Sequence, residues 1–102
     1  MKDTKEAIAE YEVIMVYYKA IMTYGIRAQS VVAIEELSEL TKEITKQLRG
    51  KGNADHLIEE IADVEIMLGQ LKMMYDIYDG DVDEYKKRKI ERLRASLEVK
   101  HE

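Results

Sequence analysis

Two pairs of carboxylates have the spacing of metal ligands carried on helices. Glu36 and Glu39 are three positions apart, and Glu60 and Asp63 repeat that spacing after an intervening stretch of 20 residues. Residues three apart lie on one face of an α-helix, so each pair is predicted to project from one side of its helix. Carboxylate oxygens are hard ligands that favour magnesium or manganese over zinc. The four residues are therefore predicted to bind Mg²⁺, with Mn²⁺ as the alternative.

The rest of the chain predicts the helices that would position these pairs. It contains no proline and only five glycines, and its apolar residues recur at spacings of three and four. Gly25 and Gly50 are predicted to end the first two helices, and Asp81 with Glu84 has the spacing of a capping box that opens the fourth. The first helix is expected at about Asp3–Tyr24, and the second from Gln29 or Ser30 to Arg49. The third is expected to begin at a cap formed by Asn53 or Asp55 and to end at about Tyr78, and the fourth is expected at about Val82–Glu98.

The two acidic pairs are predicted to meet in an antiparallel helix hairpin. Each of the four residues precedes a residue of its own helix's apolar stripe by one position, an offset of about 100°. With the stripes facing each other, equal offsets bring both acidic edges to the same side, within roughly 8 Å of level. Converging carboxylates repel each other and lose hydration, which a divalent cation or shared protons would offset. The alternative is that chance placed these acids on a solvated face. The predicted stripes are Ala33, Leu37, Leu40, Ile44 and Leu48, and Leu57, Ile61, Val64, Leu68 and Leu71.

Composition indicates a single domain over residues 1–102, with an all-α, four-helix bundle-like fold. Apolar residues make up 46% of the chain and charged residues 36%, which excludes a disordered or membrane-embedded class. The net charge of -5 argues against binding to nucleic acid. The chain has no cysteine, and we find no secretory signal and no apolar run of membrane-spanning length. A cytoplasmic protein is expected.

The first predicted helix carries more apolar surface than one core requires. Residues 13–18 read Val-Ile-Met-Val-Tyr-Tyr without a polar interruption. A helix that is apolar on several sides needs a second packing partner. Two explanations remain open, namely a central position within a four-helix bundle, or an interface of a homodimer or homotetramer.

The acidic motif resembles that of a known family. Glu35-Glu36-x-x-Glu39 followed by Glu60-x-x-Asp63 is similar to the signature of the all-α nucleoside triphosphate pyrophosphohydrolases, the MazG-like and dimeric dUTPase-like group. The resemblance covers roughly Gly25 to Leu93. Tyr24-Gly25 and Gln29 resemble the start of the family's first metal-binding helix. The segment from Glu59 to Val64 resembles the second metal-binding helix, with Ala62 where many members have glycine. Lys89-Ile90-x-Arg92-Leu93 resembles the basic segment that often follows.

The resemblance implies Mg²⁺-dependent hydrolysis of an NTP or dNTP to the nucleoside monophosphate and pyrophosphate. It implies that the two acidic pairs hold the metal, that Glu35 orients the site or assists the attacking water, and that Gln29 contacts the base or sugar. Phosphate contacts are expected from Lys86, Lys89 and Arg92, because arginine in particular suits bidentate capture. A solvated basic face on the last helix is the alternative for these three residues.

Two other functions fit parts of the sequence. One is a non-catalytic interaction module, in which the first helix carries the partner surface and the acids only solvate the hairpin. The other is a carboxylate-bridged di-iron or di-manganese bundle, which also uses glutamates on facing helices. That class requires a Glu-x-x-His motif on each of two helices, and the sequence has only one such spacing, Glu98 to His101.

Overall fold

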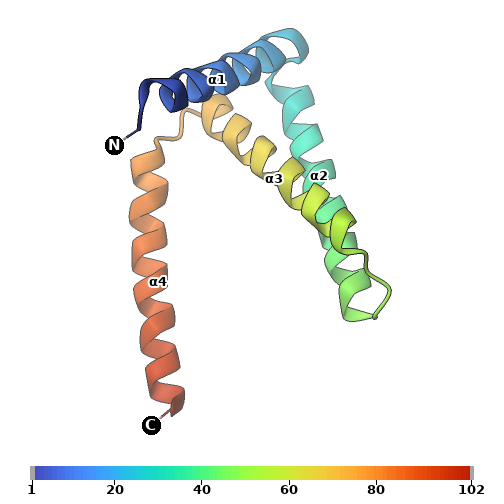
Figure 1. Ribbon diagram of the computed structural model, residues 1–102, viewed down its shortest axis with the longest axis vertical. Helices are drawn as coiled ribbons and strands as arrows, with labels where there is room; N and C mark the ends of the chain where they lie inside the picture. The colour runs from blue at the N-terminus through green and yellow to red at the C-terminus, as the bar shows by residue number, and fades with distance from the viewer. Residues whose placement is uncertain (1, 102) are drawn as a thin grey trace.

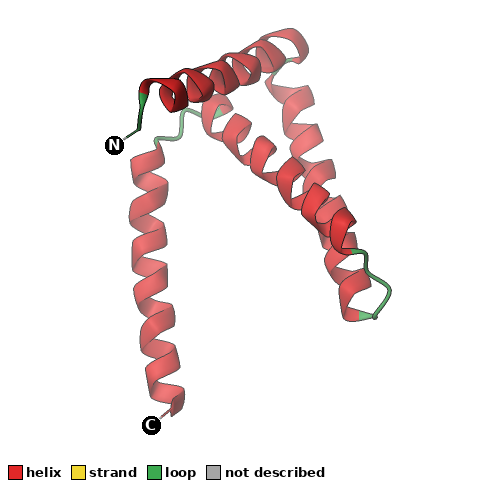
Figure 2. Cartoon of the chain, viewed as in Figure 1, coloured by secondary structure: helices red, strands yellow, loops and turns green. Residues whose placement is uncertain are grey.

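The computed structural model describes residues 2–101, with side chains described for residues 2–99. These residues form four helices and no strand (Figure 1, Figure 2). The helices are α1 (Thr4–Tyr24), α2 (Ile26–Leu48), α3 (Ala54–Met74) and α4 (Asp79–His101). The prediction of an all-α fold is confirmed. Within the described range, no helix has both the length and the apolar character needed to cross a membrane.

Side-chain caps begin both α1 and α3. Asp3 Oδ1 accepts a hydrogen bond of 2.8 Å from the backbone N–H of Glu6. Asn53 Oδ1 accepts from the N–H groups of Asp55 and His56, at 2.8 and 3.2 Å. Each cap satisfies backbone donors that have no partner inside the helix. Asn53, one of the two predicted caps of the third helix, is confirmed.

The loop between α2 and α3 contains a glycine in the left-handed region directly after the C-cap Arg49. Gly50 has a φ of 70°, a conformation that glycine adopts without steric penalty. The N–H of Gly50 donates to the carbonyl of Gln47 at 3.1 Å, and that of Lys51 donates to the carbonyl of Lys46 at 2.9 Å. These two bonds form a Schellman motif, which ends α2 and turns the chain back along it.

The predicted start of the second helix, at Gln29 or Ser30, is wrong. Helix α2 begins at Ile26, directly after Gly25. Gly25 has a φ of 92°, and its N–H donates to the carbonyl of Ile21 while its own carbonyl accepts from the N–H of Gln29. One residue with positive φ therefore both ends α1 and starts α2, so no further loop is needed.

The predicted end of the third helix at Tyr78 is also wrong. Helix α3 ends at Met74, because Asp76 adopts a left-handed conformation with a φ of 53°. The N–H of Ile77 then donates to the carbonyl of Lys72 at 2.9 Å, which completes a second Schellman-type ending. Aspartate tolerates this conformation better than most residues, so an ending usually marked by glycine was missed.

Helix α4 begins at Asp79, three residues before the predicted start at Val82. The N–H of Asp81 donates to the carbonyl of Tyr78 at 3.0 Å, so Asp81 already lies in the first helical turn. It therefore cannot be the cap of that helix, and the predicted capping box with Glu84 is wrong.

The helices form a bundle-like arrangement from which α4 projects. Helices α2 and α3 make an antiparallel hairpin, and α1 lies across the end of the hairpin opposite its loop (Figure 1). Helix α4 leaves the end of α3 and extends away from the hairpin (Figure 1). The radius of gyration is 17.3 Å, against about 13 Å for a compact domain of this length. The single chain is therefore open, and much of its apolar surface is not covered by its own helices.

The contact between α2 and α3 is rotated from the predicted apolar stripes toward the acidic residues. The buried apolar residues of the described chain are Ala33 on α2 and Val64, Met67 and Met74 on α3. Several stripe residues instead keep 42–47% of their surface exposed, namely Leu37, Ile44, Ile61 and Leu68. The polar residues Gln29, Glu43 and Gln70 are buried. The expectation that the two apolar stripes face each other is corrected accordingly, because polar and acidic side chains occupy part of the contact face.

Candidate metal centre

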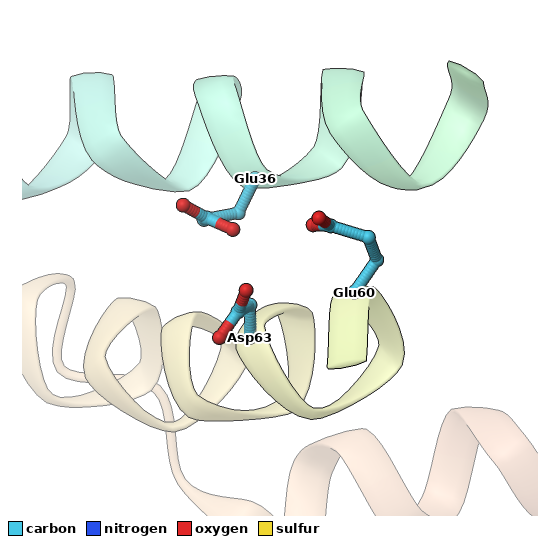
Figure 3. Close-up of side chains that lie close together, drawn as sticks. All are labelled: Glu36, Glu60 and Asp63. Atoms are coloured by element: carbon cyan, nitrogen blue, oxygen red, sulfur yellow. The ribbon is translucent and has the colours of Figure 1, made fainter. Parts of the chain in front are cut away.

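Three of the four predicted metal ligands converge between α2 and α3. Glu36 projects from α2 toward α3, where Asp63 and Glu60 point back at it (Figure 3). One carboxylate oxygen from each of these residues lies within 4.8 Å of the other two. All three side chains are half-buried. The predicted convergence of acids across the hairpin is confirmed for these residues.

The local sequence explains why these three side chains meet. On α2, positions 29, 33, 36, 40 and 43 alternate spacings of four and three, and they face α3. On α3, positions 57, 60, 64 and 67 alternate spacings of three and four, and they face α2. This is the spacing of the contact seam between paired helices, whose seam residues are normally apolar. Glu36 and Glu60 occupy seam positions, and Asp63 flanks the seam one turn after Glu60.

The electrostatics of the cluster disfavour three unshielded charges. Burial raises the pKa of Glu36 above its usual value, and the negative charges of Asp63 and Glu60 raise it further. The pKa of Glu60 is raised in the same way, first by burial and then by the charges of Asp63 and Glu39. Glu60 Oε2 is also buried without a hydrogen-bond partner. A divalent cation would relieve both the repulsion and the missing partner, so the residues fit a hard metal ion.

Glu39, the fourth predicted ligand, lies beside the cluster. Its side chain is half exposed and makes an ion pair of 3.7 Å with Lys42 on the same helix. Its charge still contributes to the raised pKa of Glu36 and of Glu60. Glu39 therefore lies near the three converging carboxylates, but its oxygens are not part of that group. Glu35, one position before Glu36, is exposed on α2.

Gln29, predicted to touch a substrate, is buried two helical turns from Glu36. Its Nε2 donates a hydrogen bond of 2.7 Å to Oε1 of Gln70 on α3. Next to this pair, the hydroxyl groups of Ser30 and Tyr75 are 2.7 Å apart. The sequence reasoning did not single out Gln70. Its spacing of seven residues from Asp63, which matches that of Gln29 from Glu36, was the available signal.

The predicted phosphate-binding residues lie on a different part of the chain. Lys86, Lys89 and Arg92 are exposed on α4, which extends away from the hairpin (Figure 1). The groups that shift the pKa of Glu36 and Glu60 are all acidic. Within one chain the structure does not bring the three basic residues to the carboxylates.

Comparison with known proteins adds no relative. No family model, curated protein or solved structure matches this chain.

Proposed function

We propose that the chain is a Mg²⁺-dependent nucleoside triphosphate pyrophosphohydrolase, as its resemblance to the MazG-like group implies. The reaction is hydrolysis of an NTP or dNTP between its α and β phosphates, which yields the nucleoside monophosphate and pyrophosphate. The observation that carries the proposal is the approach of Glu36, Glu60 and Asp63 carboxylate oxygens to within 4.8 Å of one another. Such a set of oxygen donors on two facing helices suits a hard divalent cation.

The roles of the residues follow from their positions. Glu36, Glu60 and Asp63 bind the cation, and Glu39 joins them by releasing Lys42, its partner in a half-exposed ion pair. Bound magnesium supplies charge neutralisation for the triphosphate and activation of a water. Glu35, exposed on α2 one position before Glu36, is assigned to orienting that water. Nucleoside triphosphates are cytoplasmic metabolites, so the activity is assigned to the cytoplasm.

The proposal also requires assembly of more than one chain. The open shape leaves apolar residues of α1 uncovered, among them Val16 and Tyr18, which are 63% and 50% exposed. Monomers rarely expose so much contiguous apolar surface. A homodimer or homotetramer would cover it. Assembly would also give the basic residues of α4, namely Lys86, Lys89 and Arg92, a route to the carboxylates of another chain.

The direct test is pyrophosphate release from a panel of NTPs and dNTPs with Mg²⁺. We expect Asp63→Asn to lower the rate by at least about 100-fold, the upper end for loss of an outer-shell metal partner. The matched control is Glu65→Gln, which neutralises an exposed acid on the same helix and should keep the wild-type rate. Equal rates in the wild type and in Asp63→Asn would remove this carboxylate from the mechanism.

A non-catalytic interaction module is the second candidate, and the exposed apolar face of α1 favours it. A magnesium titration of thermal stability separates the two functions. The enzyme binds Mg²⁺ in its folded state, so its Tm should rise with Mg²⁺ and the rise should disappear in Asp63→Asn. A module whose acids only solvate the hairpin should show no such linkage.

A further inference from the structure

Each helix of the hairpin carries a second stripe besides the seam that joins it to the other helix. On α2 the second stripe consists of positions 34, 37, 41 and 44, and on α3 of positions 58, 61, 65 and 68. Both alternate spacings of three and four, which is the spacing of residues that pack against a neighbouring helix. A helix with two such stripes packs against two neighbours in a four-helix bundle. The hairpin itself supplies only one of the two.

The two second stripes lie on the same side of the hairpin. Each of their positions follows a seam position by one, as Leu37 follows Glu36 and Ile61 follows Glu60, which is a rotation of about 100°. Equal rotations of two antiparallel helices end on one side, and the two stripes together are called the uncovered face below. Its apolar members keep 42–64% of their surface exposed, namely Ile34, Leu37, Ile44, Ile58, Ile61 and Leu68.

The charges on the hairpin indicate what kind of surface fits this face. Among its eight positions Glu65 is the only charged residue. Glu39 and Asp63 each precede a seam position by one, so they lie on the opposite side of the hairpin. Helix α4 fits poorly, because its residues 86–89 are four consecutive basic residues that would lose hydration against apolar side chains. An equally apolar helix pair fits better.

The surface area of the chain allows an interface of this kind. Its accessible surface is 8581 Å², whereas a compact monomer of this mass exposes about 6,000 Å². Part of the excess of about 2,600 Å² comes from the projecting helix α4 (Figure 1). The excess is still about three times the roughly 800 Å² that each partner buries in a stable protein interface. The chain therefore has enough uncovered surface for a stable dimer.

We propose that the uncovered face packs against the same face of a second copy of the chain, so that two hairpins form one four-helix bundle. Such a contact is isologous, with the same residues on both sides. The opposite side of each hairpin, which carries Glu39 and Asp63, then points away from the partner and stays open to solvent. The inference rests on the assembly that the proposed function requires, but it needs neither metal nor hydrolysis.

The first test measures self-association by sedimentation equilibrium, in chelator and without nucleotide. The wild type should have a mass of at least two chains of 11.9 kDa. Ile61→Glu places an unpaired charge in the interface and should raise the dissociation constant at least about 100-fold. The matched control is Val31→Glu, because Val31 is 46% exposed, close to the 42% of Ile61, and lies off the uncovered face. It should associate as the wild type does.

A second test uses thiol reactivity, because the chain has no cysteine of its own. Thr41 lies on the uncovered face and Ser38 lies off it. Both are exposed in the single chain, and each hydroxyl donates to the carbonyl four residues earlier. The thiol of Thr41→Cys should react with a maleimide at least about tenfold more slowly than that of Ser38→Cys, because the partner covers it. Adding Ile61→Glu should remove the difference.

Three results would overturn the inference. They are a wild type with the mass of one chain, an Ile61→Glu variant that associates as the wild type does, and equal reactivity of the two thiols. Association that survives Ile61→Glu but is abolished by Val16→Glu would assign the contact to α1 instead. If circular dichroism shows that Ile61→Glu does not fold, the two single cysteine variants still decide the question.

Failure of the inference is distinguishable from failure of the proposed function. Protection of Thr41→Cys without pyrophosphate release would reject only the hydrolase. Release that depends on Asp63, from a chain whose two thiols react equally, would reject only this contact.

Discussion

Replacing Gln70 by leucine tests whether the buried amide pair holds the hairpin together. Gln29 and Gln70 are 8% and 5% exposed, and their side chains are joined by a hydrogen bond of 2.7 Å. Gln70→Leu leaves the amide of Gln29 facing an apolar side chain in a buried position. Such an unsatisfied group costs about 1–3 kcal/mol of folding free energy. At about 4–8 °C per kcal/mol for a domain of this size, a cost of about 2 kcal/mol corresponds to a Tm lower by about 8–16 °C.

The double variant distinguishes a lost hydrogen bond from a general loss of packing. Gln29→Leu combined with Gln70→Leu removes both partners and leaves no unsatisfied amide, so most of the stability should return. The coupling between the two substitutions should therefore be about 1–3 kcal/mol, well above the roughly 0.5 kcal/mol that independent sites show. Urea and thermal unfolding, in chelator and at fixed protein concentration, measure it. Gln47→Leu, at an exposed position on α2, is the control and should change little.

Two outcomes would refute this reasoning. Single variants that unfold at the wild-type Tm would mean that the amide bond adds nothing. A double variant whose loss equals the sum of the single losses would mean that the two side chains act independently.

The same variants separate the two roles considered for Gln29, namely holding the hairpin together and contacting the substrate. If the pair serves to hold the hairpin, the KM for nucleotide hydrolysis should rise in the single variants and recover together with stability in the double variant. A KM that stays raised would assign Gln29 to substrate contact instead.

Three further predictions concern charge, backbone and assembly. Because the folded-state pKa values of Glu36 and Glu60 are raised, their contribution to stability is fully present below the ordinary value near 4.5 and is lost as pH rises through the raised values. Thermal unfolding in chelator should therefore show these two groups stabilising the protein as pH falls from neutral, and Glu36→Gln should flatten the profile. Gly50→Ala should destabilise the protein by about 1–2 kcal/mol in urea unfolding, because φ is 70° there; an unchanged midpoint would contradict the role of this turn. Val16→Glu should shift the mass in light scattering toward the 11.9 kDa of one chain, whereas Lys19→Glu should not, and a wild type already at that mass would reject assembly.

The sequence was sufficient to predict four helices and the meeting of three of the four acids. Helix formation and capping depend on neighbouring residues, so the spacing of apolar positions, Asn53 and Gly50 predicted most of the hairpin. The shared offset of Glu36, Glu60 and Asp63 predicted their convergence, although the contact between the helices is rotated from the apolar stripes on which that prediction was built. The ending at Asp76 was missed because a left-handed aspartate has no distinctive pattern in the chain.

Only the tertiary structure decided which arc of each helix lies in the contact. The apolar residues of α2 and α3 cover a wide arc, and periodicity alone does not choose the seam within it. The actual seam is rotated toward the acids, so Glu43 and Gln70 are buried while Leu37 and Leu68 are exposed. Burial is a property of two surfaces in contact. The fate of a side chain at the edge of a stripe therefore depends on how the partner helix is rotated and on what else covers the hairpin.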